Sequence, residues 1–168
     1  MRPVRRLQER TMPRITPNLW FDTQAKDAAE FYVSVFPHSR VTQVSYYGEA
    51  GPRPAGTVLT VDFELDGQPY TAINGGPEFT FDEAISLLIN CADQSEVDYY
   101  WDALGKGGRT GPCGWLKDRY GLSWQVVPDA LGELMADPDP ARAQRALQAM
   151  LGMEKLDVEA LRAAADGG

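Results

Sequence analysis

The chain repeats one order of predicted secondary structure. Residues 15–21 predict a strand, and residues 40–47, 57–65 and 68–74 predict three more. A helix between the first two strands is indicated by apolar residues at helical spacing: Ala28, Phe31, Tyr32, Val35 and Phe36. The same order of strand, helix and short strands recurs over residues 85–127. Because neither half buries enough surface alone, the repeat predicts two β-α-β-β-β units that share one core.

Aspartates mark the predicted starts of both helices. Asp22 or Thr23 is placed to cap the first helix, and Asp93 with Glu96 forms a capping-box-like start for the second. These positions are equivalent in the two units, which favours a duplication.

The repeat divides the chain into three predicted parts. Residues 13–128 form an α+β domain, with modules of about 13–77 and 78–128 and a curved, mostly antiparallel sheet around a pocket. Residues 129–168 are rich in Ala, Leu and Met and predict helices. We expect these C-terminal helices to pack on the outer face of the sheet or on a second subunit.

Residues 1–12 differ from the rest of the chain. They are basic and have no apolar periodicity, so we expect a disordered arm. Met12 opens directly onto the first predicted strand and is the expected natural start. A short amphipathic targeting arm is the alternative.

Composition excludes two classes of function. The net charge of −8 is unfavourable for a general nucleic-acid binder, since phosphate contacts need clustered Lys and Arg. No apolar run approaches the length that crosses a membrane. Cys91 and Cys113 show no metal-ligand spacing, and no secretory segment is recognisable. We therefore predict a cytoplasmic protein with reduced thiols.

The stretch 113–128 carries the clearest strand pattern. Side chains alternate between the two faces of a strand, so the polar Ser123 and Gln125 lie on the face opposite Trp124. We expect the apolar face to pack on a helix. The polar face then turns toward water or a cavity.

Several segments resemble one protein family. They are I-T-P-N-L-W-F-D, F-E-L-D-G, A-I-N-G-G-P, C-G-W-L-K-D-R-Y-G-L-S-W-Q-V-V-P and D-P-D-P. Together with the element order they are similar to the PhnB-like branch of the vicinal oxygen chelate (glyoxalase/bleomycin-resistance/dioxygenase) superfamily, often labelled 3-demethylubiquinone-9 3-methyltransferase. The resemblance implies paired β-α-β-β-β modules, a homodimer and a pocket inside the curved sheet. It does not fix the chemistry, because this fold serves isomerases, lyases, dioxygenases, thiol transferases and drug-binding proteins.

The resemblance also bears on metal binding. Metal-dependent relatives carry His, Gln or Glu on the first strands and Glu on the last strands of their modules. The matching positions here hold no imidazole or carboxylate: Thr16, Thr71 or Ala72, Ser86 and Gln125. His38, the sole histidine, follows the helix-ending Pro37 and is expected in a solvated loop. We predict no metal and no cofactor, with an unusual site at Asp118 or Glu64 as the open alternative.

The methyltransferase label finds little support in the glycine pattern. A nucleotide-binding loop has glycines between an early strand and the following helix. The glycine clusters here fall after a strand that leads into a loop, at 74–77, and at the end of a helix, at 105–108. We expect neither to bind a nucleotide.

Strand alternation predicts a neutral, amide-rich and aromatic pocket. It is expected to use these substrate-binding residues: Asn18, Trp20, Asn74, Asn90, Trp115 and Gln125. Tyr70 and Ala72 accompany Asn74 on the fourth strand in this prediction. Uncharged amides and flat aromatic faces suit a small planar or carbonyl-bearing ligand. The alternative for each amide is a loop cap or a bond to the backbone.

A reaction would need further groups. Asp118 as a base and Tyr120 as an acid are the candidates, although a charged turn residue is more often structural. Cys113 as a nucleophile has no neighbouring histidine in sequence. The favoured function is metal-independent binding of a small organic ligand by a homodimer. The alternatives are a lyase or isomerase, a metal-dependent enzyme of the superfamily, and a scaffold that acts through its C-terminal helices.

Overall fold

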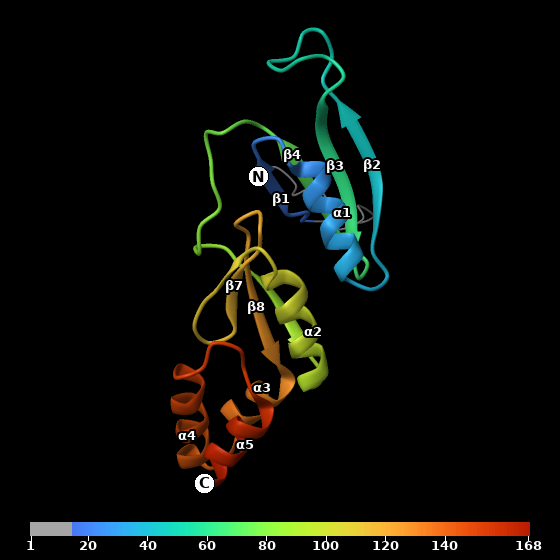
Figure 1. Cartoon of the computed structure of the whole chain (residues 1–168). Helices are drawn as coiled ribbons and strands as arrows, with labels where there is room; N and C mark the ends of the chain where they lie inside the picture. Colours follow the sequence, from blue (N-terminus) through green and yellow to red (C-terminus); the bar gives the residue numbers. More distant parts are fainter. Residues whose placement is uncertain (1–14) are drawn as a thin grey trace, which may run out of the picture.

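The structure, a computed structural model, describes residues 15–168 and consists of two modules followed by three helices (Figure 1). The predictions for the arm at residues 1–12 and for Met12 lie outside the described residues. The first module contains β1 (Asn18–Phe21), α1 (Ala25–Val35), β2 (Arg40–Tyr46), β3 (Val58–Leu65) and β4 (Gln68–Asn74). The second contains β5 (Leu87–Cys91), α2 (Gln94–Gly105), β6 (Arg109–Thr110), β7 (Trp115–Lys117) and β8 (Ser123–Pro128).

The strands form two four-stranded sheets with equivalent topology. Their orders are β1-β4-β3-β2 and β5-β8-β7-β6. The β1–β4 and β5–β8 pairs are parallel, and the other pairs are antiparallel. The α+β class and the duplicated β-α-β-β-β unit predicted from the sequence are therefore confirmed.

The two helices begin differently. Asp93 caps α2 as predicted, and its Oδ1 accepts a hydrogen bond from Glu96 N at 3.0 Å. The predicted cap of α1 by Asp22 or Thr23 is wrong. Asn74, at the end of β4, accepts a 2.8 Å hydrogen bond from Ala25 N instead. A side chain distant in sequence thus satisfies the first N–H group of α1, which has no partner within the helix.

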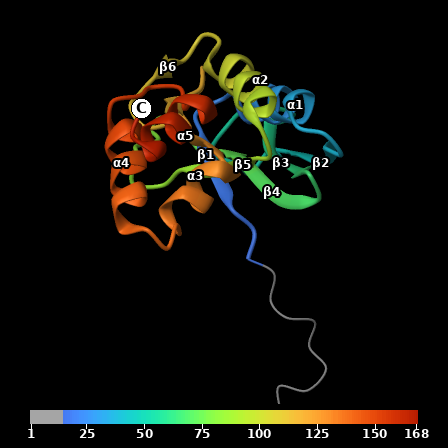
Figure 2. The same ribbon diagram turned by 90° about the horizontal axis from the view of Figure 1, so that it is seen from below.

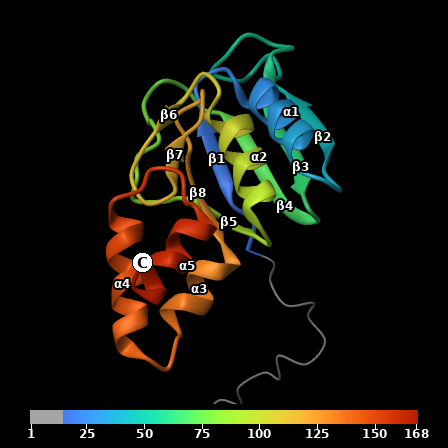
Figure 3. The ribbon, with the colours of Figure 1, turned by 60° about the horizontal axis from the view of Figure 1, so that its bottom comes forward.

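One core joins the two modules. Helices α1 and α2 lie side by side on the same side of the two sheets (Figures 2 and 3). Tyr32 of α1 and Phe36, which follows the last residue of α1, lie against Trp124 of β8, with ring centroids 5.5 Å and 5.4 Å from the Trp124 ring respectively. Leu104 of α2 and Val126 of β8 are fully buried in the same cluster. Burial of aromatic surface between the modules explains why each needs the other.

The register of β8 follows the predicted alternation. Trp124 and Val126 are 2% and 0% exposed and face the helices. Gln125 and Val127 are half-buried on the opposite face. The second sheet therefore turns one apolar face to the helices and presents a more polar face on its other side.

The C-terminal helices pack mainly on one another. They are α3 (Asp129–Met135), α4 (Pro140–Leu151) and α5 (Val158–Asp166). Their shared core comprises Leu131, Leu134, Ala146, Leu156, Leu161 and Ala165. They lie at the end of β8 (Figure 1), and α3 packs beside that strand instead of covering the sheet face. Pro140 occupies the first turn of α4, and Asp139 caps the helix. Within residues 15–168, every helix is too short or too polar to span a membrane.

Candidate functional site

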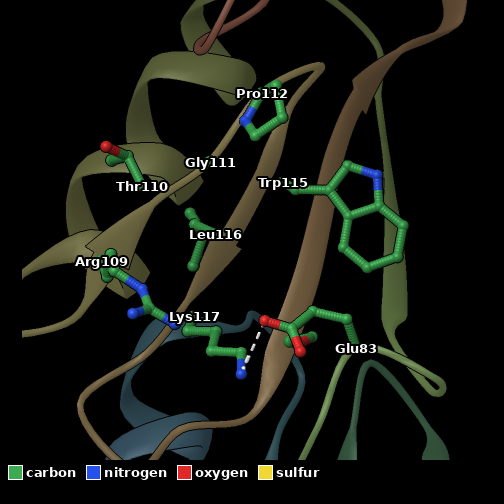
Figure 4. A pocket seen from close by; sticks show the side chains of 9 residues that line it. Glu83, Arg109, Thr110, Gly111, Pro112, Trp115, Leu116 and Lys117 are labelled. Carbon is green, nitrogen blue, oxygen red and sulfur yellow. Dashed lines mark ion pairs between the residues drawn. The ribbon is translucent and has the colours of Figure 1, made fainter.

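A cavity of ≈ 290 Å³ lies at the edge of the second sheet, on the face opposite α1 and α2 (Figure 4). Its lining includes Glu83, Arg109, Pro112, Trp115, Lys117 and Ser123. Strands β6, β7 and β8, the turn between β6 and β7, and the loop before β5 supply these residues. The apolar walls and a few polar groups are typical of a small-molecule site.

Strand pairing places the lining side chains in rows. Lys117 of β7 lies between Arg109 of β6 and Ser123 of β8, since it is paired with both. Trp115 is paired with Gln125 in the next row. Directly opposite residues point to the same face of a sheet, so all five side chains start from the cavity side.

The charges of the cavity are partly neutralised by an ion pair. Lys117 Nζ lies 2.7 Å from a carboxylate oxygen of Glu83 (Figure 4). The hydrogen bond from Lys117 lowers the pKa of Glu83, and the charge of Arg109 acts in the same direction. The Glu83 carboxylate is therefore held ionised by the two cations.

The Ser123 hydroxyl is a polar group without a partner. It is fully buried, and its Oγ makes no hydrogen bond to any part of the chain that the structure describes. A buried hydroxyl without a partner costs free energy, and such groups are rare. Ser123 is among the residues that border the cavity.

The C-terminal extension fixes one rim of the cavity. Cys113 N and Gly114 N each donate a 2.7 Å hydrogen bond, to Met153 O and Glu154 O respectively. Gly114 has a φ of 82°, and a Cβ there would approach Val126 O to 2.7 Å. Only glycine fits this close approach, so the turn before β7 is locked between β8 and the segment after α4.

The structure brings two of the predicted binding residues together. Trp115 and Gln125 are opposite each other, and Gln125 Nε2 donates a 2.8 Å hydrogen bond to Ser86 Oγ. Asn90 is exposed on β5 and lines a different cavity of ≈ 370 Å³, together with Leu88. The amides of the second module thus do not converge on one cavity.

The predicted residues of β1 lie elsewhere. Asn18 is exposed at the start of the strand. Trp20 lines a separate cavity of ≈ 410 Å³, its Nε1 donates a 2.8 Å hydrogen bond to Gly76 O, and its ring meets Phe79 edge-on. The expected meeting of Trp20, Asn90 and Gln125 in one concavity is not seen.

The predicted face of β4 is wrong. Ala72 and Asn74 are buried on the helix side of the sheet, whereas Thr71 and Ile73 occupy the other face. Asn74 uses both ends of its amide within the protein. Its Oδ1 caps α1, and its Nδ2 donates to Val58 O at 3.1 Å. The alternative of a structural amide therefore accounts for Asn74.

Asp118 is the centre of a buried hydrogen-bond network. Its Oδ2 accepts from Tyr32 Oη and Trp124 Nε1, both at 2.8 Å. Its Oδ1 accepts from the backbone of Tyr120 at 2.8 Å and of Leu122 at 3.2 Å. Asp118 is only 3% exposed, and burial raises its pKa although the hydrogen bonds act in the opposite direction. These contacts give Asp118 a structural role.

The hydrogen bond between Tyr120 and the Asp118 carboxylate is made by the Tyr120 backbone N–H. The Tyr120 ring packs against Phe21, Phe31 and Tyr32, and it borders the same cavity as Trp20. Burial raises the pKa of Tyr120. The acid and base roles of these two residues stay predictions, and the geometry favours the structural alternative.

The positions matched to metal ligands make bonds within the protein. Besides the Ser86–Gln125 pair, Thr71 Oγ1 donates a 2.6 Å hydrogen bond to Asp62. Over residues 15–168, no three His, Cys, Asp or Glu side chains gather in a possible metal site. Glu64 is paired with Arg40.

The other reactive side chains lie outside the cavity lining. His38 is exposed beside Asp66, as expected for a loop residue. Cys91 is buried, and burial raises its pKa to about 12, which keeps the thiol protonated. Cys113 is half-buried in the turn before β7.

Sequence reasoning missed the charged part of the site. The cavity was predicted to be neutral, but it contains Arg109, Lys117 and Glu83. The two-residue period of β7 puts Lys117 on the same face as Trp115, a signal that was available in the sequence. The position of Glu83 depends on the loop between the modules, so no local pattern indicates it.

Comparisons with known proteins agree with the fold. Paired β-α-β-β-β modules with parallel first and last strands define the class as a vicinal oxygen chelate type protein. The chain belongs to the PhnB-like family of this superfamily, because the family model described as "3-demethylubiquinone-9 3-methyltransferase" matches residues 13–127. The helices α3 to α5 lie outside that match.

Solved structures support the assignment. A putative 3-demethylubiquinone-9 3-methyltransferase, PhnB protein, from Bacillus cereus is 35% identical, with a TM-score of 0.62 over 68% of this chain and 98% of that chain. Protein PA1353 from Pseudomonas aeruginosa is 19% identical, with a TM-score of 0.57 over 68% of this chain and 96% of that chain, and shows the fold alone. No curated protein matches the chain.

Proposed function

We propose that this protein binds a small organic ligand in the cavity beside Trp115, without a metal ion. The observation that carries the proposal is the buried, unpartnered hydroxyl of Ser123 at a cavity of ≈ 290 Å³. Trp115 offers a flat apolar surface, and Arg109 and Lys117 offer hydrogen-bond donors. A small number of polar groups on apolar walls is enough to orient a bound ligand, and such a site needs no catalytic group.

The geometry does not favour methyl transfer. A nucleotide-binding loop needs glycines between a strand and the N-terminus of a helix. Here β1 leads to α1 through residues 22–24, which are Asp, Thr and Gln. The lyase or isomerase alternative has no better support, since the Asp118 carboxylate is occupied by four protein donors.

Substitution of Trp115 by alanine tests the proposed site. Ligands are first found by thermal-shift screening of small organic compounds on the wild-type protein. Trp115→Ala should weaken their binding by about tenfold or more, because the aromatic surface is lost. The half-buried position of Trp115 limits the loss of stability to about 2 kcal/mol.

The matched control for that experiment is Trp20→Ala, which alters a tryptophan in a different cavity. Calorimetric titration of the same ligands should give unchanged affinity for this variant. Weakening by Trp20→Ala and not by Trp115→Ala would move the site to the cavity of the first module.

Metal independence is a separate expectation. The positions matched to metal ligands hold neutral groups such as Ser86 and Gln125, and structural or catalytic metals of this family need imidazole or carboxylate donors. Elemental analysis of tag-free protein should find less than about 0.1 equivalent of Zn, Ni, Fe or Mn. Near-stoichiometric metal that survives dialysis would contradict this.

We further propose a cytoplasmic homodimer. Support comes from the resemblance to the family and from apolar residues on the helix-free faces, such as Leu88 at 52% exposure. Sedimentation equilibrium should give twice the 18.5 kDa mass of one chain. A mass of one chain over the accessible concentration range would overturn the dimer.

A further inference from the structure

We propose that the ligand of this cavity is a small carboxylate with a flat apolar body, and that Glu83 acts as an internal substitute for its carboxylate at Lys117. This inference rests on the proposed function and names the ligand class for the same site. It follows from the charge of the lining, the burial of the ion-paired groups and the unpartnered hydroxyl of Ser123.

The charge of the lining contrasts with that of the protein. The chain carries a net charge of −8, but the cavity is lined by Arg109 and Lys117 against the single carboxylate of Glu83. Both cations are close enough to Glu83 to lower its pKa. A lining with excess positive charge in an acidic protein favours an anionic ligand and disfavours a cationic one.

The two members of the ion pair differ in exposure. The Lys117 side chain is 20% exposed, whereas that of Glu83 is 59% exposed. A cation on a side chain that is largely covered by protein is more favourable beside an anion, because partial removal from water penalises an unpaired charge. Glu83 loses little when it returns to water, since it lies on the loop before β5 and its carboxylate regains hydration. Exchange of Glu83 for a ligand carboxylate keeps Lys117 paired.

The rest of the cavity defines the body of the ligand. Trp115 provides apolar surface on the side of Glu83, and Pro112 provides more at the end of the cavity away from the ion pair (Figure 4). Ser123 lies directly opposite Lys117 on the neighbouring strand, so its hydroxyl starts from the same face of the sheet as the Lys117 side chain. A neutral amide cannot replace Glu83 at Lys117, and an amine meets the positive charge of Arg109.

The experiment is a calorimetric comparison of matched probes on the full chain. The carboxylates are indole-3-acetate and phenylacetate, compared with indole-3-acetamide, phenylacetamide, tryptamine and phenethylamine. Each carboxylate should bind at least about tenfold more tightly than its amide, the effect of one charge-assisted contact. Equal or tighter binding of the amides or amines overturns the carboxylate inference but leaves a ligand site in place. Failure of every probe to bind overturns the proposed function as well.

Three variants test the role of individual groups. Glu83→Gln removes the internal competitor and should tighten carboxylate binding by about tenfold, while Lys117→Met should abolish the preference over amides. Ser123→Ala should weaken binding by about threefold to tenfold, the value of one hydrogen bond. Glu30→Gln is the matched control, since Glu30 is an exposed carboxylate paired with Lys26 on α1, and it should leave affinity unchanged. Weaker carboxylate binding by Glu83→Gln contradicts the substitution model.

Discussion

Asp118→Ala should lower the free energy of unfolding by about 3 to 5 kcal/mol. The substitution removes the acceptor of the buried Tyr32 hydroxyl and the Trp124 indole N–H. The backbone N–H groups of Tyr120 and Leu122 lose their acceptor as well. Burial raises the pKa of Tyr32, so its hydroxyl stays protonated and serves as a donor. Urea unfolding followed by far-UV circular dichroism measures the loss.

The control is Asp102→Ala, which removes an exposed aspartate from α2 and should change stability by less than about 0.5 kcal/mol. A different result for Asp118→Ala would favour a catalytic role. A fully stable Asp118→Ala protein that loses the conversion of a bound ligand would restore Asp118 as a base and would contradict the structural role.

Trp124→Ala should cost about 3 to 5 kcal/mol of stability as a core truncation. Trp124 is 2% exposed, stacks on Phe36 and donates a hydrogen bond to Asp118. The neighbouring Gln125→Ala should cost no more than about 1 kcal/mol, because Gln125 is half-buried on the other face and loses one hydrogen bond to Ser86. Thermal and urea unfolding of both variants measure the difference.

These two substitutions test the polarity of β8. If Gln125→Ala unfolds the protein while Trp124→Ala has no effect, the strand faces the opposite way. Trp115 is paired with Gln125, so the cavity face of β7 would then be reassigned as well.

Local patterns predicted most of the fold. The alternation in residues 122–127 placed Trp124 and Gln125 on opposite faces, and the capping of α2 by Asp93 depends only on neighbouring residues. The cap of α1 was missed because its acceptor, Asn74, lies 49 residues away and becomes adjacent only through the β1–β4 pairing. The prediction of which β4 side chains face the pocket was wrong for the same reason, because the packing of β4 in the sheet decides which of its faces the helices cover.

The site was predicted less completely than the fold. Trp115, which lines the cavity, was named; Gln125 was also named and lies opposite Trp115, but it is not one of the lining residues. The ion pair of Glu83 with Lys117 joins a loop between the modules to β7, and a sequence pattern carries no information on such a contact. The burial of the Ser123 hydroxyl likewise depends on packing above the strand and not on the alternation along it.

Amide chemical-shift mapping of ¹⁵N-labelled protein with a ligand from the thermal-shift screen directly tests the proposal that the cavity of the second module is the ligand site. The largest shifts should fall on residues 109–117 and on Ser123 to Gln125, where strands β6 to β8 line the cavity. Shifts confined to Trp20, Phe79 and Tyr120 around the first-module cavity would contradict it.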